Sequence, residues 1–213
     1  MMRSQPQLIR AKLDTLMPTQ MTVGKIEVAI KRKEWAKLGK KARSVALASH
    51  WFPSVLGADG RHYIVDHHHF GVALLEEDVK TVSLMVLKDL SWLTPASFWL
   101  VMEHHQWVHP YDSIGMRRSF DLIPTHLEQM RDDPYRSLAG RLRSAGGYAK
   151  DVTPYSEFLW ADFFRTRIAS ERLAQHFSKA LATALKLAHS KEARYLPGWS
   201  GIQATAISGK LYD

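Results

Sequence analysis

The sequence predicts an α+β fold, with a small mixed sheet and helices over residues 1–90 and a largely helical region over residues 91–213 packed on it. Short apolar runs bounded by turn residues indicate strands in the first region, whereas apolar residues at spacings of three and four indicate helices in the second. The hydrophobic content of 46% and charged content of 23% are ordinary for a globular protein with a buried core.

The first region contains the strand and turn signals. Two apolar runs on either side of Gly57-Ala58-Asp59-Gly60 predict a β-hairpin, because an Asp-Gly dipeptide such as Asp59-Gly60 favours a tight turn. The elements expected in order are a strand over 7–13, a turn at 18–20, a helix over 23–39, the hairpin over 55–65 and a buried strand over 81–87.

The second region contains helix signals. Thr94-Pro95 and Thr153-Pro154 each combine a preferred N-cap residue with a proline suited to the first helical position. Apolar residues at helical spacing also predict one amphipathic helix over residues 170–190.

The most informative segment is Asp66-His67-His68-His69, which follows the apolar run Tyr63-Ile64-Val65 and precedes a second apolar run. This order predicts a strand, a sharp turn and a helix start. The first turn of a helix has unpaired N–H groups and the positive end of the macrodipole, so it can bind an anion. Imidazoles there can donate hydrogen bonds, bind a metal or move protons. The segment is therefore our candidate phosphate site.

Three interpretations of the histidines stay open at this point. They can contact a phosphate, they can ligate a metal of unknown identity, or they can satisfy buried backbone groups. Consecutive helical residues diverge by about 100°, so at most two of the three could face one ion. Further ligands would then come from elsewhere, with His104, His105 and His109 as candidates.

The histidine segment resembles the phosphate-binding box of the ParB/sulfiredoxin-like superfamily, most closely its small bacterial ParB-like nuclease branch. Other segments that carry the resemblance are Leu16–Gln20, Asp133–Ser137, Gly146–Asp151 and Phe158–Arg165. The resemblance implies a sheet-and-helix fold, a nucleotide such as ATP or ADP as ligand, and a divalent metal such as Mg²⁺ as cofactor. It also makes His67 and His68 our candidate catalytic residues, because the box residues nearest the strand point toward the phosphate in the resembling families. The chain departs from the superfamily at Phe70, where an arginine usually ends the box.

The resemblance also implies a role for Glu27, because a glutamate in this neighbourhood is the general base of the superfamily's free-serine kinases. An ordinary helix-surface glutamate is the alternative interpretation. Thr19 and Gln20 are candidate ligand contacts, or they close the turn before the helix.

A second group of polar candidates follows in the helical region. Asp162 and Arg165 are three residues apart and can pair on a helix surface, or they can lie at the edge of a pocket with aromatic neighbours. The secondary pocket candidates are Arg141, Lys150, Asp151, Asp162 and Arg165.

The net charge of +8 favours an anionic partner, and much of it lies in the segment Lys31–Arg43. We expect a nucleotide- or phosphate-binding enzyme that catalyses phosphoryl transfer or phosphodiester hydrolysis. The alternatives are a non-catalytic protein that binds nucleic acid weakly and without sequence specificity, and a His-ligated metalloprotein acting on a small molecule.

Cysteine is absent, which excludes disulfides and sulfiredoxin chemistry. No apolar run approaches membrane-spanning length, so we expect a cytoplasmic protein with no membrane partner.

Overall fold

The computed structural model describes residues 7–202. The chain divides into two compact units, Met1–Ser137 and Leu138–Asp213. The boundary expected near residue 90 coincides with the end of the main sheet, and the unit that contains this sheet continues to Ser137. None of the described helices is long and apolar enough to cross a membrane.

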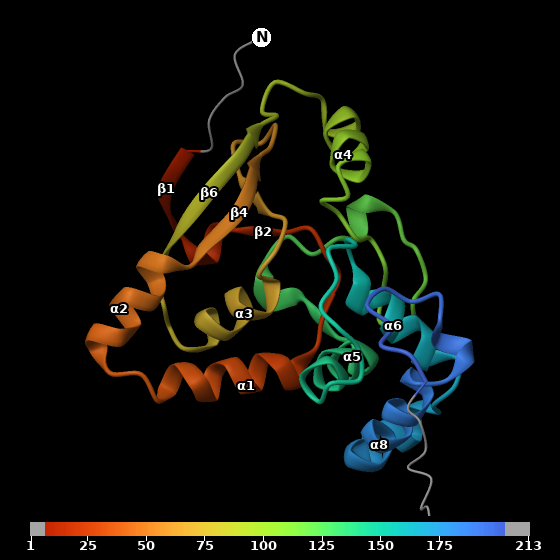
Figure 1. Ribbon diagram of the computed structural model, residues 1–213. Coiled ribbons are helices and arrows are strands. Elements are labelled where there is room, and N and C mark those ends of the chain that lie inside the picture. The colour runs from red at the N-terminus through yellow and green to blue at the C-terminus, as the bar shows by residue number, and fades with distance from the viewer. Residues whose placement is uncertain (1–6, 203–213) are drawn as a thin grey trace, which may run out of the picture. The chain divides into compact units, whose positions relative to one another are not determined.

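The first unit is built on a mixed five-stranded sheet in the order β1-β6-β4-β5-β2 (Figure 1). The β6 strand pairs antiparallel with β1 and parallel with β4, whereas β5 pairs antiparallel with β4 and parallel with β2. The strands are β1 Gln7–Lys12, β2 Met17–Pro18, β4 Trp51–Leu56, β5 His62–Ile64 and β6 Thr81–Asp89. The short strands β3 Thr22–Val23 and β7 Arg131–Asp132 pair in parallel in a separate sheet.

The predicted hairpin and both predicted long strands are confirmed. Thr94 caps its helix as expected, since its hydroxyl accepts a hydrogen bond from the N–H of Ser97. The helices of this unit are α1 Lys25–Ala36, α2 Lys40–Ser49, α3 His68–Glu76 and α4 Pro95–His104, with single 3₁₀ turns at Leu13–Thr15, Phe120–Leu122 and Leu127–Gln129.

The sequence predicts one helix over residues 23–39, whereas the structure has two consecutive helices in residues 25–49. The predicted helix corresponds to α1, and a second helix, α2, follows after the extended residue Gly39. No residue of α2 is fully buried, and the two that pack partly buried against the core, Ala46 and Leu47, are adjacent in sequence, so α2 lacks the clear apolar stripe by which a helix is recognised.

The second unit is mostly helical, as predicted. Its helices are α6 Ser156–Arg165, α7 Ser170–Gln175 and α8 Phe177–Ala188, with a 3₁₀ turn at Lys191–Ala193, and α5 Pro134–Ser144 spans the boundary between the units. Its core includes Trp160 and Phe164, which are fully buried, and the ring of Tyr148 stacks on Trp160 at 4.4 Å between centroids.

Two expectations for this unit are wrong. The helix α6 begins at Ser156, and Thr153 instead donates its N–H and hydroxyl to the Asp151 carboxylate in a turn. The helix expected over 170–190 is broken at His176, whose backbone is non-helical. The apolar residues Leu173 and Ala180 are seven positions apart, which is close to two helical turns, so the break leaves their spacing unchanged.

The α3 helix packs between the sheet and α1 (Figure 1). Its buried residues Val72 and Leu74 share one core with Phe52 of β4, Leu84 of β6 and Trp35 of α1. This packing fixes the start of α3 directly after the carboxyl end of β5.

We expect Leu84→Ala to lower the free energy of unfolding by about 2–5 kcal/mol, because its side chain is fully buried in the strand between β1 and β4. Leu8→Ala on the neighbouring strand is the matched control, since Leu8 is 57% exposed and should cost less than about 0.5 kcal/mol. Urea denaturation followed by circular dichroism measures both values. Equal costs would contradict this account of the core.

Candidate functional site

The connection from β5 to α3 has the predicted order of strand, sharp turn and helix. The carboxylate of Asp66 accepts the N–H of His67 at 2.6 Å. His67 is the N-cap residue of α3 and adopts the left-handed conformation, with φ 66° and ψ 20°. This conformation is uncommon for a residue with a side chain and costs on the order of 1 kcal/mol or more. The side chain of His67 makes no capping hydrogen bond to the helix.

The three imidazoles of this segment point in different directions. His67 lies against the ring of His50, with 4.6 Å between centroids. His68 turns into the core toward Thr19, and His69 turns toward α1. The divergence of His68 from His69 follows from the helical rotation between consecutive residues, and that of His67 follows from its left-handed backbone.

His68 and Thr19 are bonded to each other inside the first unit. His68 is 2% exposed, and its Nε2 accepts the N–H of Thr19 at 3.1 Å. The hydroxyl of Thr19 donates to the carbonyl of Ile64 at 2.9 Å. Burial lowers the pKa of His68 to about 4. These contacts hold the segment after β2 against the end of β5, which is a structural task whatever else the two residues do.

The second histidine cluster does not form one helical face. The α4 helix ends at His104, and the exposed His105 stacks on Trp107 at 4.2 Å between ring centroids. His109 lies instead in a β-bridge with Gln20, and burial together with the charge of Arg136 lowers its pKa to about 3. Within residues 7–202, no group of three or more histidine or acidic side chains is arranged to hold a metal ion.

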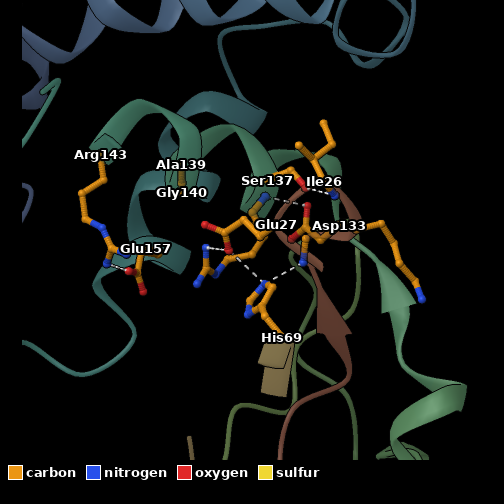
Figure 2. A network of polar contacts seen from close by, with 12 residues as sticks. Ile26, Glu27, His69, Asp133, Ser137, Ala139, Gly140, Arg143 and Glu157 are labelled. Carbon is orange, nitrogen blue, oxygen red and sulfur yellow. Dashed lines mark hydrogen bonds and ion pairs between the residues drawn. The ribbon is translucent and has the colours of Figure 1, made fainter. Parts of the chain in front are cut away.

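Glu27 lies at the centre of a network formed by three helices (Figure 2). Its Oε2 is 3.1 Å from Nη1 of Arg136 on α5 and 3.1 Å from Nε2 of His69 on α3. The exposed fractions of the side chains are 17% for Glu27, 11% for His69 and 9% for Arg136. The second oxygen, Oε1, makes no hydrogen bond or ion pair to the described residues.

The same ring nitrogen of His69 lies 2.8 Å from the backbone nitrogen of Gly24. A neutral Nε2 accepts the N–H of Gly24, whereas a protonated Nε2 can donate to Glu27, so a single ring nitrogen cannot make both hydrogen bonds at once. The presence or absence of a hydrogen on Nε2 of His69 therefore decides which of the two contacts is a hydrogen bond.

Side chains from other elements cap the start of α1. The N–H of Ile26 donates to the hydroxyl of Ser137 at 3.3 Å (Figure 2). The N–H of Lys25 donates to Asp132 at 2.8 Å. In turn, Asp133 accepts the N–H groups of Tyr135 and Arg136 at the start of α5. These caps join the starts of α1 and α5 and so position Glu27 opposite Arg136.

Sequence reasoning missed two residues of this region. Arg136 lies within the Asp133–Ser137 segment that carries part of the family resemblance, so the signal was present although no role was assigned. His50 directly follows α2, a helix that the sequence did not reveal.

The secondary pocket candidates belong to the second unit, and their role stays a prediction. Asp162 and Arg165 form an ion pair at 3.2 Å on α6, and the Asp151 carboxylate is engaged by Thr153. Arg141 is half-buried and Lys150 is exposed. A further ion pair joins Arg143 of α5 to Glu157 of α6 (Figure 2).

Comparison with known proteins assigns the family. The model of the family described as "Putative ParB-like nuclease" matches residues 9–166, which include β5, the histidine segment, Glu27 and Arg136. The chain belongs to this family. The crystal structure of protein Atu1540 from Agrobacterium tumefaciens is similar to it, with 46% sequence identity and a TM-score of 0.86 over 93% of this chain and 100% of that chain. No curated protein matches the chain.

We expect Gly24→Ala to destabilise this family member by about 1–3 kcal/mol, because the new methyl group would lie 2.9 Å from the backbone nitrogen of Ser137. Gly39→Ala is the matched control, since Gly39 is also an N-cap glycine with extended backbone and its methyl group would meet no atom within 4 Å. Chemical denaturation compares the two variants. Similar losses in both would show that the close approach at Gly24 is unimportant.

We expect His68 to make the fold sensitive to acid. Its folded pKa of about 4 lies below the value of about 6.5 in the unfolded chain, so the unfolded state binds more protons between these values. The contribution of His68 to stability is complete above pH 6.5 and falls by about 2 kcal/mol when the pH is lowered from 7 to 5. The burial of His109 acts in the same direction.

Urea denaturation of wild type and His68→Gln at pH 7 and pH 5 tests this expectation. Glutamine keeps an acceptor for Thr19 but does not titrate, so the pH-dependent loss should shrink in this variant. His104→Gln, at an exposed position on α4, should leave the loss unchanged. An undiminished loss in His68→Gln would contradict the assignment.

Proposed function

We propose that this ParB-like protein binds a phosphate-bearing small molecule or a nucleotide such as ATP or ADP at the start of α3, and catalyses phosphoryl transfer or phosphodiester hydrolysis there. The observation that carries the proposal is the carboxylate of Glu27, held by Arg136 and His69 beside the first turn of α3. The family description supports a reaction at a phosphate ester.

Glu27 has the properties needed of a general base. Arg136 holds Oε2, and Nε2 of His69 lies 3.1 Å from the same oxygen, which leaves Oε1 to accept a proton from water or an acceptor hydroxyl. A base must lie within hydrogen-bond reach of the proton that it removes, and a carboxylate held by an ion pair loses little freedom in reaching that position.

The start of α3 supplies the complementary charge. Its backbone N–H groups and the positive end of its dipole favour an anion, and the His67 side chain does not cap them. His69 links the two halves of the proposed site, because it lies in the first turn of α3 and contacts Glu27. His68 contributes by holding this turn in place.

The residues near α3 do not fit a protein-bound Mg²⁺ ion. Mg²⁺ prefers oxygen ligands, and the carboxylates on this side are Glu27, which Arg136 and His69 already engage, and Asp66, which bonds to His67. The neighbouring side chains of Lys31, His50 and His67 are basic. We therefore assign the proposed chemistry to the protein groups alone.

The alternative function, weak and non-specific binding of nucleic acid, rests on the basic segment Lys31–Arg43. Its exposed lysines include Lys33, Lys37, Lys40 and Lys41, which can contact phosphates. Part of the charge is already engaged, since Arg32 pairs with Glu76 and Glu77. Non-specific binding to DNA that weakens steeply with salt, without turnover, would favour this alternative.

Glu27→Gln tests the proposed function. We expect a 10²–10⁴-fold loss in turnover of a panel of phosphate esters and nucleotides, because glutamine keeps the size of the side chain but cannot accept a proton as a base. Glu34→Gln, an exposed change on the same helix, should keep the wild-type rate. Product release is followed by phosphate assay and chromatography, and circular dichroism verifies folding. Wild-type turnover in Glu27→Gln, or no turnover of any panel member by wild type, would overturn the proposal.

A further inference from the structure

A cluster of basic and aromatic side chains lies beside His67, on the side away from His68. The ring of His50 is 4.6 Å from that of His67 and 4.7 Å from that of Phe70, measured between centroids. The ammonium group of Lys31 lies over the face of Phe70, 5.9 Å from its centroid. Three elements contribute these residues, since Lys31 is on α1, His50 follows α2, and His67 and Phe70 belong to the start of α3.

The aromatic neighbours give this cluster a fixed frame. The rings of Phe52 and Phe70 are stacked at 5.9 Å, and the edge of Phe70 meets Trp35 at 6.3 Å. Phe52 and Trp35 are buried, whereas His50 is exposed and His67 is half-buried. The two imidazoles therefore lie on a rigid apolar base with access to solvent.

The charges around the two histidines are mostly of one sign. Burial, then the neighbouring His67 and Lys31, lower the pKa of His50, and Asp66 opposes them. Burial and Lys31 lower the pKa of His67, again against Asp66. Like charges that repel each other without a ligand are stabilised when an anion contacts them from the solvent side.

We infer that His50, His67 and Lys31 form a subsite for a terminal, dianionic phosphate group. The inference rests on the proposed function in placing a phosphate at the start of α3, and it adds the substrate class: a phosphate monoester or the end phosphate of a nucleotide. Two imidazolium groups and one ammonium match a group with two negative charges better than an internal diester, which carries one. Phosphate binding there draws protons onto the two imidazoles.

Phe70 has a specific place in this subsite. Its ring contacts His50 at 4.7 Å between centroids and lies under the ammonium group of Lys31, so it supports both side chains. The positive charge beside the start of α3 thus comes from α1 and from the end of α2.

Binding of methyl phosphate and dimethyl phosphate to the full chain tests the inference. Histidine Cε1–H resonances, assigned with His50→Gln and His67→Gln, report contact at each ring, and calorimetry gives affinity and proton uptake. At pH 6.5 we expect methyl phosphate to bind at least about tenfold more tightly than dimethyl phosphate and to shift both resonances. Affinity for methyl phosphate should rise as the pH falls from 8 to 6.5.

Single variants separate this subsite from a general effect of charge. We expect His50→Gln and Lys31→Met each to weaken methyl phosphate binding by about tenfold, with proton uptake reduced in the histidine variant. His105→Gln is the matched control, because His105 is also exposed beside a lysine, Lys88 at 3.2 Å, and stacks on an aromatic ring. It should bind methyl phosphate as wild type does.

The outcomes distinguish this inference from the proposed function. If no ester is turned over but methyl phosphate shifts His50 and His67 and loses affinity in His50→Gln, the subsite stands and the proposed function fails. The subsite is overturned and the proposed function stands if Glu27→Gln abolishes turnover while His50→Gln binds methyl phosphate with wild-type affinity and shows the wild-type shift of the His67 resonance. Equal affinity for the two esters would also overturn the subsite.

Discussion

The ion pair between Glu27 and Arg136, with His69 beside it, is the contact on which the organisation of the site depends. Its three side chains come from α1, α5 and α3, and each is nearly buried. Breaking such a pair by removing one partner typically costs 3–5 kcal/mol, because the other charge stays buried without compensation. The caps of α1 and α5 are part of the same arrangement, since Asp132, Asp133 and Ser137 hold the helix starts in place. Packing, capping and charge therefore support one geometry.

The three consecutive histidines illustrate how position decides chemistry. They have identical side chains, yet His67 is half-buried beside His50, His68 is buried against Thr19, and His69 lies 3.1 Å from Glu27. The buried His68 is neutral at physiological pH and holds the turn, so its neighbours need not serve that purpose. One short segment thereby combines a structural residue, a residue linked to a fixed carboxylate and a residue available to a ligand.

Much of the fold could be predicted because its signals are local. The hairpin at Gly57–Gly60, the β6 strand and the cap at Thr94 each follow from a few adjacent residues. The missed α2 helix contacts the core through two adjacent, partly buried residues, Ala46 and Leu47, and the break at His176 leaves the helical spacing on either side intact, so periodicity could reveal neither. Glu27 was selected through a family resemblance, but its partner Arg136 is 109 positions away, and no spacing rule connects them.

The charges beside α3 form two sets, which are the Glu27–Arg136 ion pair and the basic cluster of His50, His67 and Lys31. The guanidinium of Arg136 lies against the carboxylate of Glu27, so the charge of that pair is balanced before any ligand arrives. His50 and His67 are less basic than free histidine because of burial, and they lie beside Lys31 without such a balancing pair between them. A phosphate that approaches α3 thus meets one region whose electrostatics are already satisfied and another whose charge increases in response to it. The first suits holding a base in position, and the second suits recognising the charge of the ligand.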